Sequence, residues 1–257
     1  MEKKEKLMLR KNRTKFGLIG RNISYSFSAG YFKNKFEKLG LNNFTYENFD
    51  LPEIFEFPFI LYQRKELFGG FNVTIPYKEA VQRYLDNIDE EAVQIGAVNT
   101  IKVEEDDTLT GFNTDVFGFV NSLKPLLKAH HTSALILGTG GASKAVAYGL
   151  DKLGIQYQFV SRSDEGGRLL YSQLTENHLK EHTLIVNCSP VGTYPNVNDA
   201  PKIPYEFITD KHFLYDLIYN PEVTAFLQRG KERGAIVKNG LEMLELQAER
   251  SWELWNS

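Results

Sequence analysis

The feature that most constrains the fold is a short apolar run followed directly by a glycine-rich turn and a helix-like stretch. Ala134–Leu137 leads into Gly138–Gly141, after which small and apolar residues recur at helical spacing from Ala142 to Leu153. Glycines let a turn close tightly and let the backbone approach a bound group, and a helix N-terminus favours an anion. Tight turns alone also need glycine, but strand, turn and helix in this order favour a dinucleotide-binding unit.

The rest of the second half alternates strand and helix patterns regularly. Further strands are expected at Gln156–Val160, Thr183–Val186, Phe213–Ile218 and Ala235–Val237. Such alternation predicts a doubly wound parallel sheet. A final helix is expected over Leu241–Trp255, with an apolar face formed by Leu241, Leu244, Ala248, Trp252 and Trp255.

The first half predicts a mixed sheet instead, because a hairpin interrupts the alternation. Val98–Val103 and Thr108–Phe112 flank a turn at Glu105–Asp107. Other strands are expected at Lys15–Ile19, Phe44–Phe49 and Phe71–Thr74, and helices around Phe32, Phe36 and Leu39, closed by Gly40, and over Tyr77–Leu85. The fold class is therefore α/β.

A helix near Val116–Lys128 and the polar patch His130–Ser133 mark the junction between the two halves. We interpret His130 and His131 as a solvated linker surface rather than as metal ligands, because the other histidines have no ligand spacing. No metal site is predicted.

Composition and charge exclude several classes of protein. A formal net charge of -3 over 257 residues gives no general attraction to nucleic acid. No apolar stretch approaches the roughly 20 residues of a membrane-spanning helix, and Met1–Arg13 alternates charges rather than forming a signal peptide. The single cysteine, Cys188, is typical of a reducing cytoplasm. We expect a cytoplasmic protein with no membrane or nucleic-acid partner.

The second strand of the dinucleotide unit ends in Val160, Ser161, Arg162 and Ser163, with no acidic residue at its end. An acidic residue there usually binds the ribose hydroxyl of NAD, whereas an arginine can pair with the 2′-phosphate of NADP. A surface arginine in a polar loop is the alternative. NADP is favoured.

Three further segments carry polar side chains at strand ends. Lys78 follows the strand and turn Gly70–Pro76, near the expected start of a helix, where a cation is disfavoured and acid–base use is favoured. Asn99 lies at a strand start, and Asp115 lies at a strand-to-helix junction. A helix N-cap is the alternative role for Asp115.

In combination these segments resemble the shikimate dehydrogenase family, from about Phe16 to the C-terminus. The matching segments, in the family's order and spacing, are Asn72–Lys78, Gly96–Thr100, Asn113–Asp115, Gly138–Ala142, Asn187–Gly192 and Gly240–Leu244.

The resemblance implies a role for each matching residue. Lys78 would be the general acid–base, and Asp115 would pair with it. Substrate would be bound by Ser26, Ser28, Thr74, Asn99, Tyr219 and Gln247. NADP(H) would be bound by Gly138, Thr139, Gly140, Gly141, Ala142, Ser161, Arg162, Ser163, Leu217, Gly240 and Met243.

The resemblance also implies the domain organisation. Residues 1–116 would form the substrate-binding and catalytic domain, with the first 14 or so as a charged extension. Residues 117–239 would form a Rossmann NADP-binding domain, and residues 240–257 a helix that packs back on the first domain. We expect either a monomer or a homodimer.

The implied reaction is reduction of 3-dehydroshikimate to shikimate with NADPH, on the route to chorismate and the aromatic amino acids. Two alternatives stay open at this point. One is a quinate/shikimate dehydrogenase with relaxed use of NAD and NADP, against which Arg162 argues. The other is a non-catalytic NADP-binding sensor, which would have no need of Lys78 and Asp115.

Overall fold

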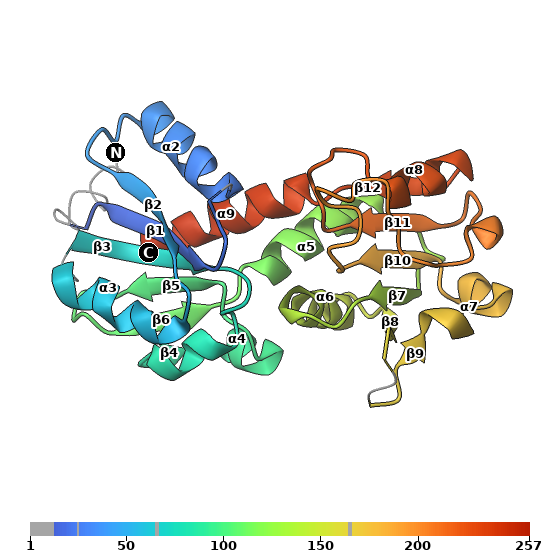
Figure 1. Ribbon diagram of the computed structural model, residues 1–257, viewed down its shortest axis with the longest axis horizontal. Helices are drawn as coiled ribbons and strands as arrows, with labels where there is room; N and C mark the ends of the chain where they lie inside the picture. The colour runs from blue at the N-terminus through green and yellow to red at the C-terminus, as the bar shows by residue number, and fades with distance from the viewer. Residues whose placement is uncertain (1–12, 25, 65–66, 164–165) are drawn as a thin grey trace. The chain divides into compact units, whose positions relative to one another are not determined.

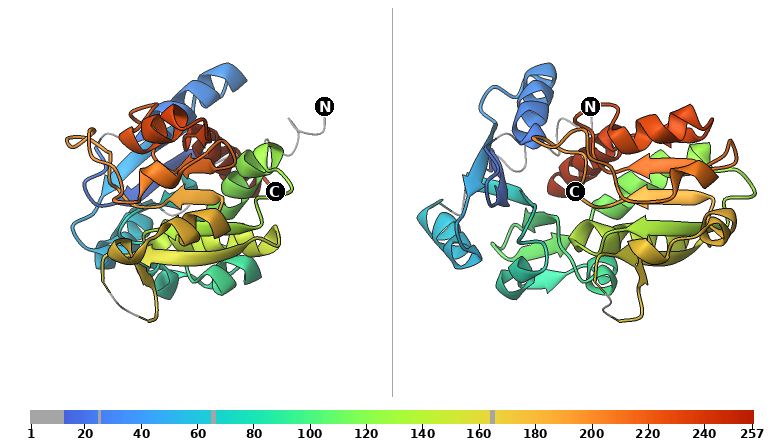
Figure 2. Two further views of the ribbon diagram at one scale, coloured as in Figure 1. Left: turned by 90° about the vertical axis from the view of Figure 1, so that its right-hand side faces the viewer. Right: turned by 45° about the vertical axis from the view of Figure 1, so that its right-hand side comes forward.

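The computed structural model describes residues 13–24, 26–64, 67–163 and 166–257 (Figure 1). The chain divides into two compact units, each with its own sheet. Unit 1 comprises the described residues up to Thr114 together with Ala248–Ser257, and unit 2 comprises Asp115–Gln247. Figure 2 shows the elements of each unit from two further sides.

Unit 1 contains the mixed sheet that the hairpin predicts. Its strands are β1 (Lys15–Gly20), β2 (Thr45–Asp50), β3 (Phe68–Val73), β4 (Asn87–Ile88), β5 (Thr100–Val103) and β6 (Leu109–Phe112). They lie in the order β2-β1-β3-β5-β6-β4. Strand β1 pairs in parallel with β2 and β3, whereas β5 pairs antiparallel with β3 and β6. The β5–β6 hairpin confirms the prediction, while β4 was not predicted.

The helices of unit 1 are α2 (Phe27–Leu39), α3 (Phe57–Arg64) and α4 (Glu90–Ile95), with 3-10 turns η1 (Ile54–Glu56) and η3 (Ala80–Tyr84). Phe32 and Phe36 are buried as expected, and Gly40 ends α2 in the left-handed conformation. The assignment of Leu39 to the buried stripe is wrong, because this residue is 52% exposed in the last turn. The helix expected over Tyr77–Leu85 is the short 3-10 helix η3.

Unit 2 contains a fully parallel sheet in the order β12-β11-β10-β7-β8-β9. Its strands are β7 (Ser133–Leu137), β8 (Gln156–Ser161), β9 (Leu169–Leu170), β10 (Leu184–Asn187), β11 (Phe213–Asp216) and β12 (Ile236–Lys238). This is the doubly wound dinucleotide-binding order, and it confirms the Rossmann fold. The strand order reverses between β7 and β10, whose carboxyl ends therefore border the binding crevice of such folds.

The helices of unit 2 are α5 (Asp115–Leu123), α6 (Gly141–Lys152), α7 (Glu176–Glu181) and α8 (Ala225–Glu232), with 3-10 turns η4 (Lys124–Leu126), η5 (Tyr171–Gln173) and η6 (Tyr205–Phe207). Helices α5 and α6 lie side by side (Figure 1). A Cβ on Gly149 of α6 would lie 2.8 Å from the ring of Phe119 on α5, so the two helices approach closely there.

The last helix, α9 (Leu241–Trp255), is shared between the units. The sequence led us to expect all of residues 240–257 on the first domain. The first half of α9 packs within unit 2 instead, where a Cβ on Gly118 of α5 would collide with the Met243 carbonyl. The expected apolar face is also partly wrong, because Leu241 is 37% exposed. The buried residues of α9 include Met243, Gln247, Ala248, Ser251 and Trp255.

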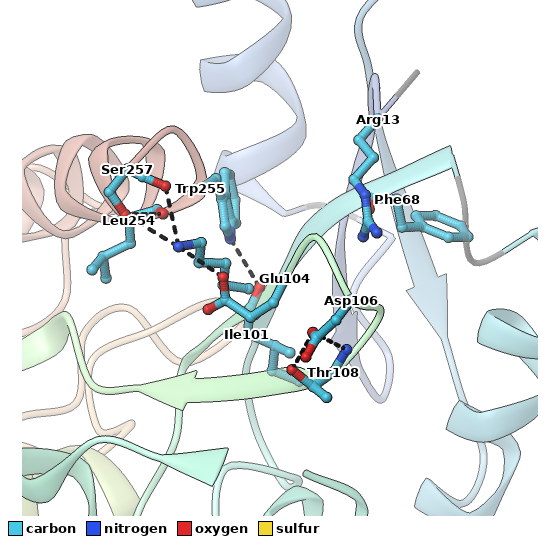
Figure 3. A network of polar contacts seen from close by, with 10 residues as sticks. Arg13, Phe68, Ile101, Glu104, Asp106, Thr108, Leu254, Trp255 and Ser257 are labelled. Carbon is cyan, nitrogen blue, oxygen red and sulfur yellow. Dashed lines mark hydrogen bonds and ion pairs between the residues drawn. The ribbon is translucent and has the colours of Figure 1, made fainter. Parts of the chain in front are cut away.

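The end of α9 is anchored to β5 of unit 1 (Figure 3). Trp255 Nε1 donates a hydrogen bond to the Ile101 carbonyl at 2.9 Å, and Lys102 Nζ donates to the Ser257 carbonyl at 3.2 Å. Arg13, near the end of the expected charged extension, pairs with Asp107 at 2.6 Å. Residues 1–12 of that extension lie outside the described residues.

The junction histidines differ from each other. His130 is exposed, as expected, but His131 is only 3% exposed, so its assignment to a solvated surface is wrong. Its Nδ1 accepts a hydrogen bond from Lys128 N at 3.0 Å, and burial lowers its pKa. Among the described residues no group of three or more His, Cys, Asp and Glu side chains could hold a metal ion. No helix in that part of the chain has the length and apolar character needed to cross a bilayer.

Candidate active site

The backbone around Lys78 is fixed from several sides within unit 1. After β3 ends, Thr74 N donates to the Ile19 carbonyl at 2.8 Å, and the Lys78 carbonyl accepts from Val98 N at 2.7 Å. The buried Tyr77 donates its hydroxyl to the Leu51 carbonyl at 2.6 Å. Lys78, which is half-buried, therefore starts from a backbone held by three neighbouring segments.

The prediction that Lys78 lies at the N-terminus of an α-helix is wrong. The sequence places Lys78 in the first turn of a helix, but the helix that follows is a five-residue 3-10 helix that begins at Ala80. So short a helix has a small dipole. What the structure provides for Lys78 is a fixed position rather than a helix terminus.

Asn99 lies at the centre of a buried network of hydroxyl and amide groups. Its Oδ1 accepts from Thr114 N at 2.7 Å, which orients the amide, and from Thr100 Oγ1 at 3.1 Å. Asn99 is 3% exposed, and Thr100 and Thr114 are buried more deeply still. Buried polar groups in a satisfied network hold their side chains in one arrangement.

The network extends to the serine motif through Tyr46. Burial raises the pKa of Tyr46, and a hydrogen bond with Ser28 opposes this shift. The phenol therefore stays protonated, and it donates to Asn72 Oδ1 at 2.8 Å. Ser26 has a structural role as well, because its Oγ accepts from Ser28 N at 3.2 Å and caps helix α2.

Asp115 is the first residue of α5 and is only 7% exposed. It therefore lies one position inside the helix rather than at the N-cap, which was the alternative role considered for it. A carboxylate in the first turn is favoured by the helix dipole. The preceding segment is fixed in unit 1, where Asn113 Nδ2 donates to the Ala97 carbonyl at 2.9 Å.

In unit 2 the glycine loop leaves its backbone open at the N-terminus of α6. Gly138 has φ 108, and an added Cβ would lie 3.3 Å from the backbone of Cys188, so glycine is required there by the fold. Gly140 differs, because an added Cβ would meet nothing within 4 Å. Packing does not explain its lack of a side chain, whereas close approach of a pyrophosphate would.

Arg162 follows the carboxyl end of β8, the strand beside β7. Its side chain is exposed, and Ser161 Oγ accepts from Ser163 N at 3.2 Å to hold the turn. Burial raises the pKa of Tyr171 to about 12, and the nearby Arg162 charge opposes this shift. A guanidinium and an aromatic ring near the glycine loop are suited to an adenosine 2′-phosphate.

The segments that carry Leu217 and Gly240 pack backbone to backbone. Gly240 N donates to the Ile218 carbonyl at 3.1 Å, and a Cβ on Gly240 would collide with the Leu217 carbonyl. Met243 and Gln247 are buried on α9, and Gln247 Nε2 donates to the Leu244 carbonyl at 3.0 Å. Tyr219 is half-buried in the loop after β11.

A buried carboxylate that the sequence did not single out holds this loop. Asp216 accepts from Asn187 Nδ2 at 3.0 Å, from Ile218 N at 3.1 Å and from Thr224 Oγ1 at 2.6 Å. Burial raises its pKa to about 6, and these hydrogen bonds oppose the shift. The sequence feature that could have pointed to Asp216 is its position as the last residue of the apolar strand β11.

Comparison with known proteins identifies relatives along nearly the whole chain. Residues 18–101 match the model of the shikimate dehydrogenase substrate binding domain. The NADP(+) shikimate dehydrogenase of Clostridium botulinum (strain Hall) is 39% identical over 248 residues, covering 93% of this chain and 95% of that protein.

Solved structures of shikimate and quinate dehydrogenases also resemble this chain over nearly its whole length. Shikimate 5-dehydrogenase from Thermus thermophilus, in complex with NADP(H) and shikimate, superposes with a TM-score of 0.81 at 33% identity, covering 94% of this chain and 92% of that one. Quinate dehydrogenase from Corynebacterium glutamicum, in complex with NAD, superposes with a TM-score of 0.83 at 26% identity, covering 95% and 93%.

Proposed function

Because the chain belongs to the shikimate dehydrogenase family, we propose that it catalyses the reversible reduction of 3-dehydroshikimate to shikimate with NADPH. The observation that carries this proposal is the buried network around Asn99. Its amide and hydroxyls are fully hydrogen-bonded to one another, and Asn99 directly follows Val98, whose N–H donates to the Lys78 carbonyl. This supports a polar site that includes Lys78.

Unit 1 is proposed to bind the substrate. A small polyhydroxylated acid needs many short donors and acceptors, and these are supplied by Ser26, Ser28, Thr74 and Asn99, with Tyr219 and Gln247 contributed by the rest of the chain. The two serines at the start of α2 suit the carboxylate, because that helix N-terminus favours an anion. Asn99, oriented by Thr114 N, suits the ring hydroxyls.

Proton transfer is assigned to Lys78, with Asp115 as its partner. When the ketone is reduced, the Lys78 ammonium gives a proton to the carbonyl oxygen, and in the reverse reaction the amine takes it from the hydroxyl. The carboxylate of Asp115 keeps the lysine oriented and hydrogen-bonds the substrate. The hydrogen bonds that hold the Lys78 carbonyl and the side chain of Asn113, two residues before Asp115, support this fixed arrangement.

Unit 2 is proposed to hold NADP(H). The open backbone of Thr139–Ala142 would cradle the pyrophosphate, and Arg162 with its flanking serines would hold the 2′-phosphate. Leu217, Gly240 and Met243 would form the wall beside the nicotinamide. Once bound, the cofactor supplies the hydride.

The deciding experiment measures initial rates with shikimate and quinate, each crossed with NADP+ and NAD+. We expect turnover of shikimate with NADP+, and much slower turnover in the other three combinations. Faster turnover of quinate or of NAD+ would replace this proposal with the quinate/shikimate alternative. Tight NADP+ binding with no turnover of either substrate would favour a sensor.

We further propose a cytoplasmic location and either a monomer or a homodimer. The half-buried thiol of Cys188, whose pKa is raised mainly by burial, suits a reducing compartment in which thiols stay unpaired. Sedimentation of the purified protein across a range of concentrations would distinguish the two oligomeric states.

A further inference from the structure

We propose that the hydroxyl of Ser251, on the C-terminal helix, is a positioning group that sets the orientation of the substrate-binding side chains of unit 1. This inference rests on the proposed function. Ser251 lies outside every motif that identifies the family, and nothing in the local sequence distinguishes it. Its place in the fold does, because it is fully buried at the point where three motif segments meet.

Three hydrogen-bonding side chains surround the Ser251 hydroxyl. Its Oγ lies 3.0 Å from Asn72 Nδ2, 2.8 Å from Thr100 Oγ1 and 3.2 Å from Thr114 Oγ1. Each of these residues comes from a different motif segment, namely Asn72–Lys78, Gly96–Thr100 and Asn113–Asp115. One hydroxyl from the end of the chain therefore contacts all three.

The chemistry of the partners determines the direction of these hydrogen bonds. Asn72 Nδ2 can only donate, so Ser251 Oγ accepts from it. Thr100 Oγ1 gives its single proton to Asn99 Oδ1, so in its contact with Ser251 it accepts and Ser251 donates. Tyr46 in turn donates to Asn72 Oδ1, and burial raises the pKa of the Tyr46 phenol, which keeps its proton. Donation runs from Tyr46 to Asn72, from Asn72 to Ser251, and from Ser251 to Thr100.

The direction of donation matters at Asn99, which accepts the last hydrogen bond of the network. Thr100 Oγ1 donates to Asn99 Oδ1 at 3.1 Å, on the same oxygen that accepts from Thr114 N. Because both donors belong to the protein, the Asn99 amide oxygen faces Thr100 and Thr114. These two bonds, together with donation from Asn99 Nδ2 to Thr114 Oγ1 at 3.1 Å, fix the amide that is proposed to recognise the substrate hydroxyls.

The network also joins the two ends of the proposed substrate site. Ser28, proposed for the carboxylate, lies close enough to Tyr46 to lower its pKa, and Asn99, proposed for the hydroxyls, lies at the other end. Asn72 Nδ2 donates directly to Thr100 Oγ1 at 3.2 Å, and Ser251 supplies a second link between the Tyr46–Asn72 half and the threonine–Asn99 half, with the shorter contact to Thr100 at 2.8 Å. Removal of the Ser251 hydroxyl should loosen substrate recognition while the nucleotide loop in unit 2 keeps its structure.

The test is Ser251→Ala, assayed for shikimate oxidation with NADP+ in the full-length protein. Loss of one buried hydrogen bond, with Asn72 left without this acceptor, should raise the KM for shikimate about five- to tenfold. The KM for NADP+ should stay within about twofold, and so should kcat. Ser251→Cys, which keeps a weaker hydrogen-bonding group of similar size, should give a smaller change in the same direction, and it serves as the test if the alanine variant does not fold.

Ser122→Ala is the matched control, because Ser122 is also a buried helical serine. Its hydroxyl contacts the Tyr215 hydroxyl at 2.7 Å and the Phe119 carbonyl at 3.1 Å, both within unit 2. It should lower thermal stability to a similar degree and leave the KM for shikimate unchanged. An unchanged shikimate KM in Ser251→Ala, or an equal rise in Ser122→Ala, overturns the proposal. A wild-type protein that does not oxidise shikimate at all would instead overturn the proposed function.

Discussion

The indole of Trp255 donates its hydrogen bond to the Ile101 carbonyl directly over Gly70, which has no side chain to obstruct it. A Cβ on Gly70 would collide with the indole nitrogen and lie 2.5 Å from the Ile101 oxygen. The neighbouring strand β5 and the end of α9 thus both depend on this glycine.

We predict that Gly70→Ala destabilises the protein by about 1–3 kcal/mol, because an extra methyl group is forced into a packed core. Urea unfolding measures the change. Gly30→Ala is the control, since Gly30 lies on the exposed side of α2 and an added Cβ meets nothing within 4 Å. It should be neutral or stabilising by up to about 1 kcal/mol. Equal midpoints for the wild type and Gly70→Ala would contradict the packing described here.

Lys78→Ala should lower kcat for shikimate oxidation by at least about a hundredfold, because the proton of the reacting hydroxyl loses its acceptor. The dissociation constant of NADP+, measured by calorimetry, should change by less than about twofold. Lys33→Ala, at an exposed position of α2, controls for the loss of a lysine charge. Wild-type turnover in Lys78→Ala would remove Lys78 from the mechanism.

Arg162→Ala should raise the KM for NADP+ by about tenfold or more, since hydrogen bonds to a charged group contribute about 1.5–3 kcal/mol. The KM for NAD+, which has no 2′-phosphate, should be unaffected. Arg233→Ala, another exposed arginine of unit 2, should change neither constant. An equal effect on both cofactors would show that Arg162 does not recognise the phosphate.

Asp216 should make stability depend on pH in a distinctive direction. Burial raises its pKa from 3.8 to about 6, so the folded state binds this proton more tightly than the unfolded state does. The contribution of Asp216 to the free energy of unfolding is therefore greatest below pH 4 and falls as the pH rises to about 6. A shift of this size corresponds to a loss of about 3 kcal/mol.

Asp216→Asn removes that titration and nearly preserves the shape of the side chain. Between pH 4 and pH 7, its free energy of unfolding should fall by about 3 kcal/mol less than that of the wild type. Urea unfolding at several pH values measures the two profiles. Asp210→Asn, at an exposed turn of the same unit, should follow the wild type. Parallel profiles for the wild type and Asp216→Asn would refute a raised pKa.

Much of the fold could be predicted from periodicity, because long apolar patterns determine which face of an element is buried. The bounds of α9 and the hairpin at β5 and β6 were predicted this way. Strands β4 and β9 were not, since two residues carry no pattern. The buried face of α9 was misassigned because Gln247 and Ser251 occupy buried positions, where Ser251 is stabilised by hydrogen bonds to residues far away in sequence.

Some residues of the candidate site could likewise be predicted from the sequence, and others could not. Lys78, Asn99 and Asp115 stand in segments with a recognisable order, so they could be proposed from the sequence. Tyr46 and Ser251 could not, because each acquires its partners only when the chain is folded. Lys78 does not lie at the helix N-terminus predicted for it, because Pro76 and Tyr77 lead into a turn rather than an α-helix.

The division of α9 between the units also sets the order in which the protein can be completed on the ribosome. Unit 1 breaks off at Thr114 and resumes at Ala248, so its aromatic core lacks Trp255 until all of unit 2 has been synthesised. At about 5–20 residues per second, the first domain to emerge waits on the order of ten seconds for its last core residue. A stop codon between the codons for Gln247 and Trp255 would therefore damage the sheet of unit 1 rather than unit 2, which is synthesised just before it.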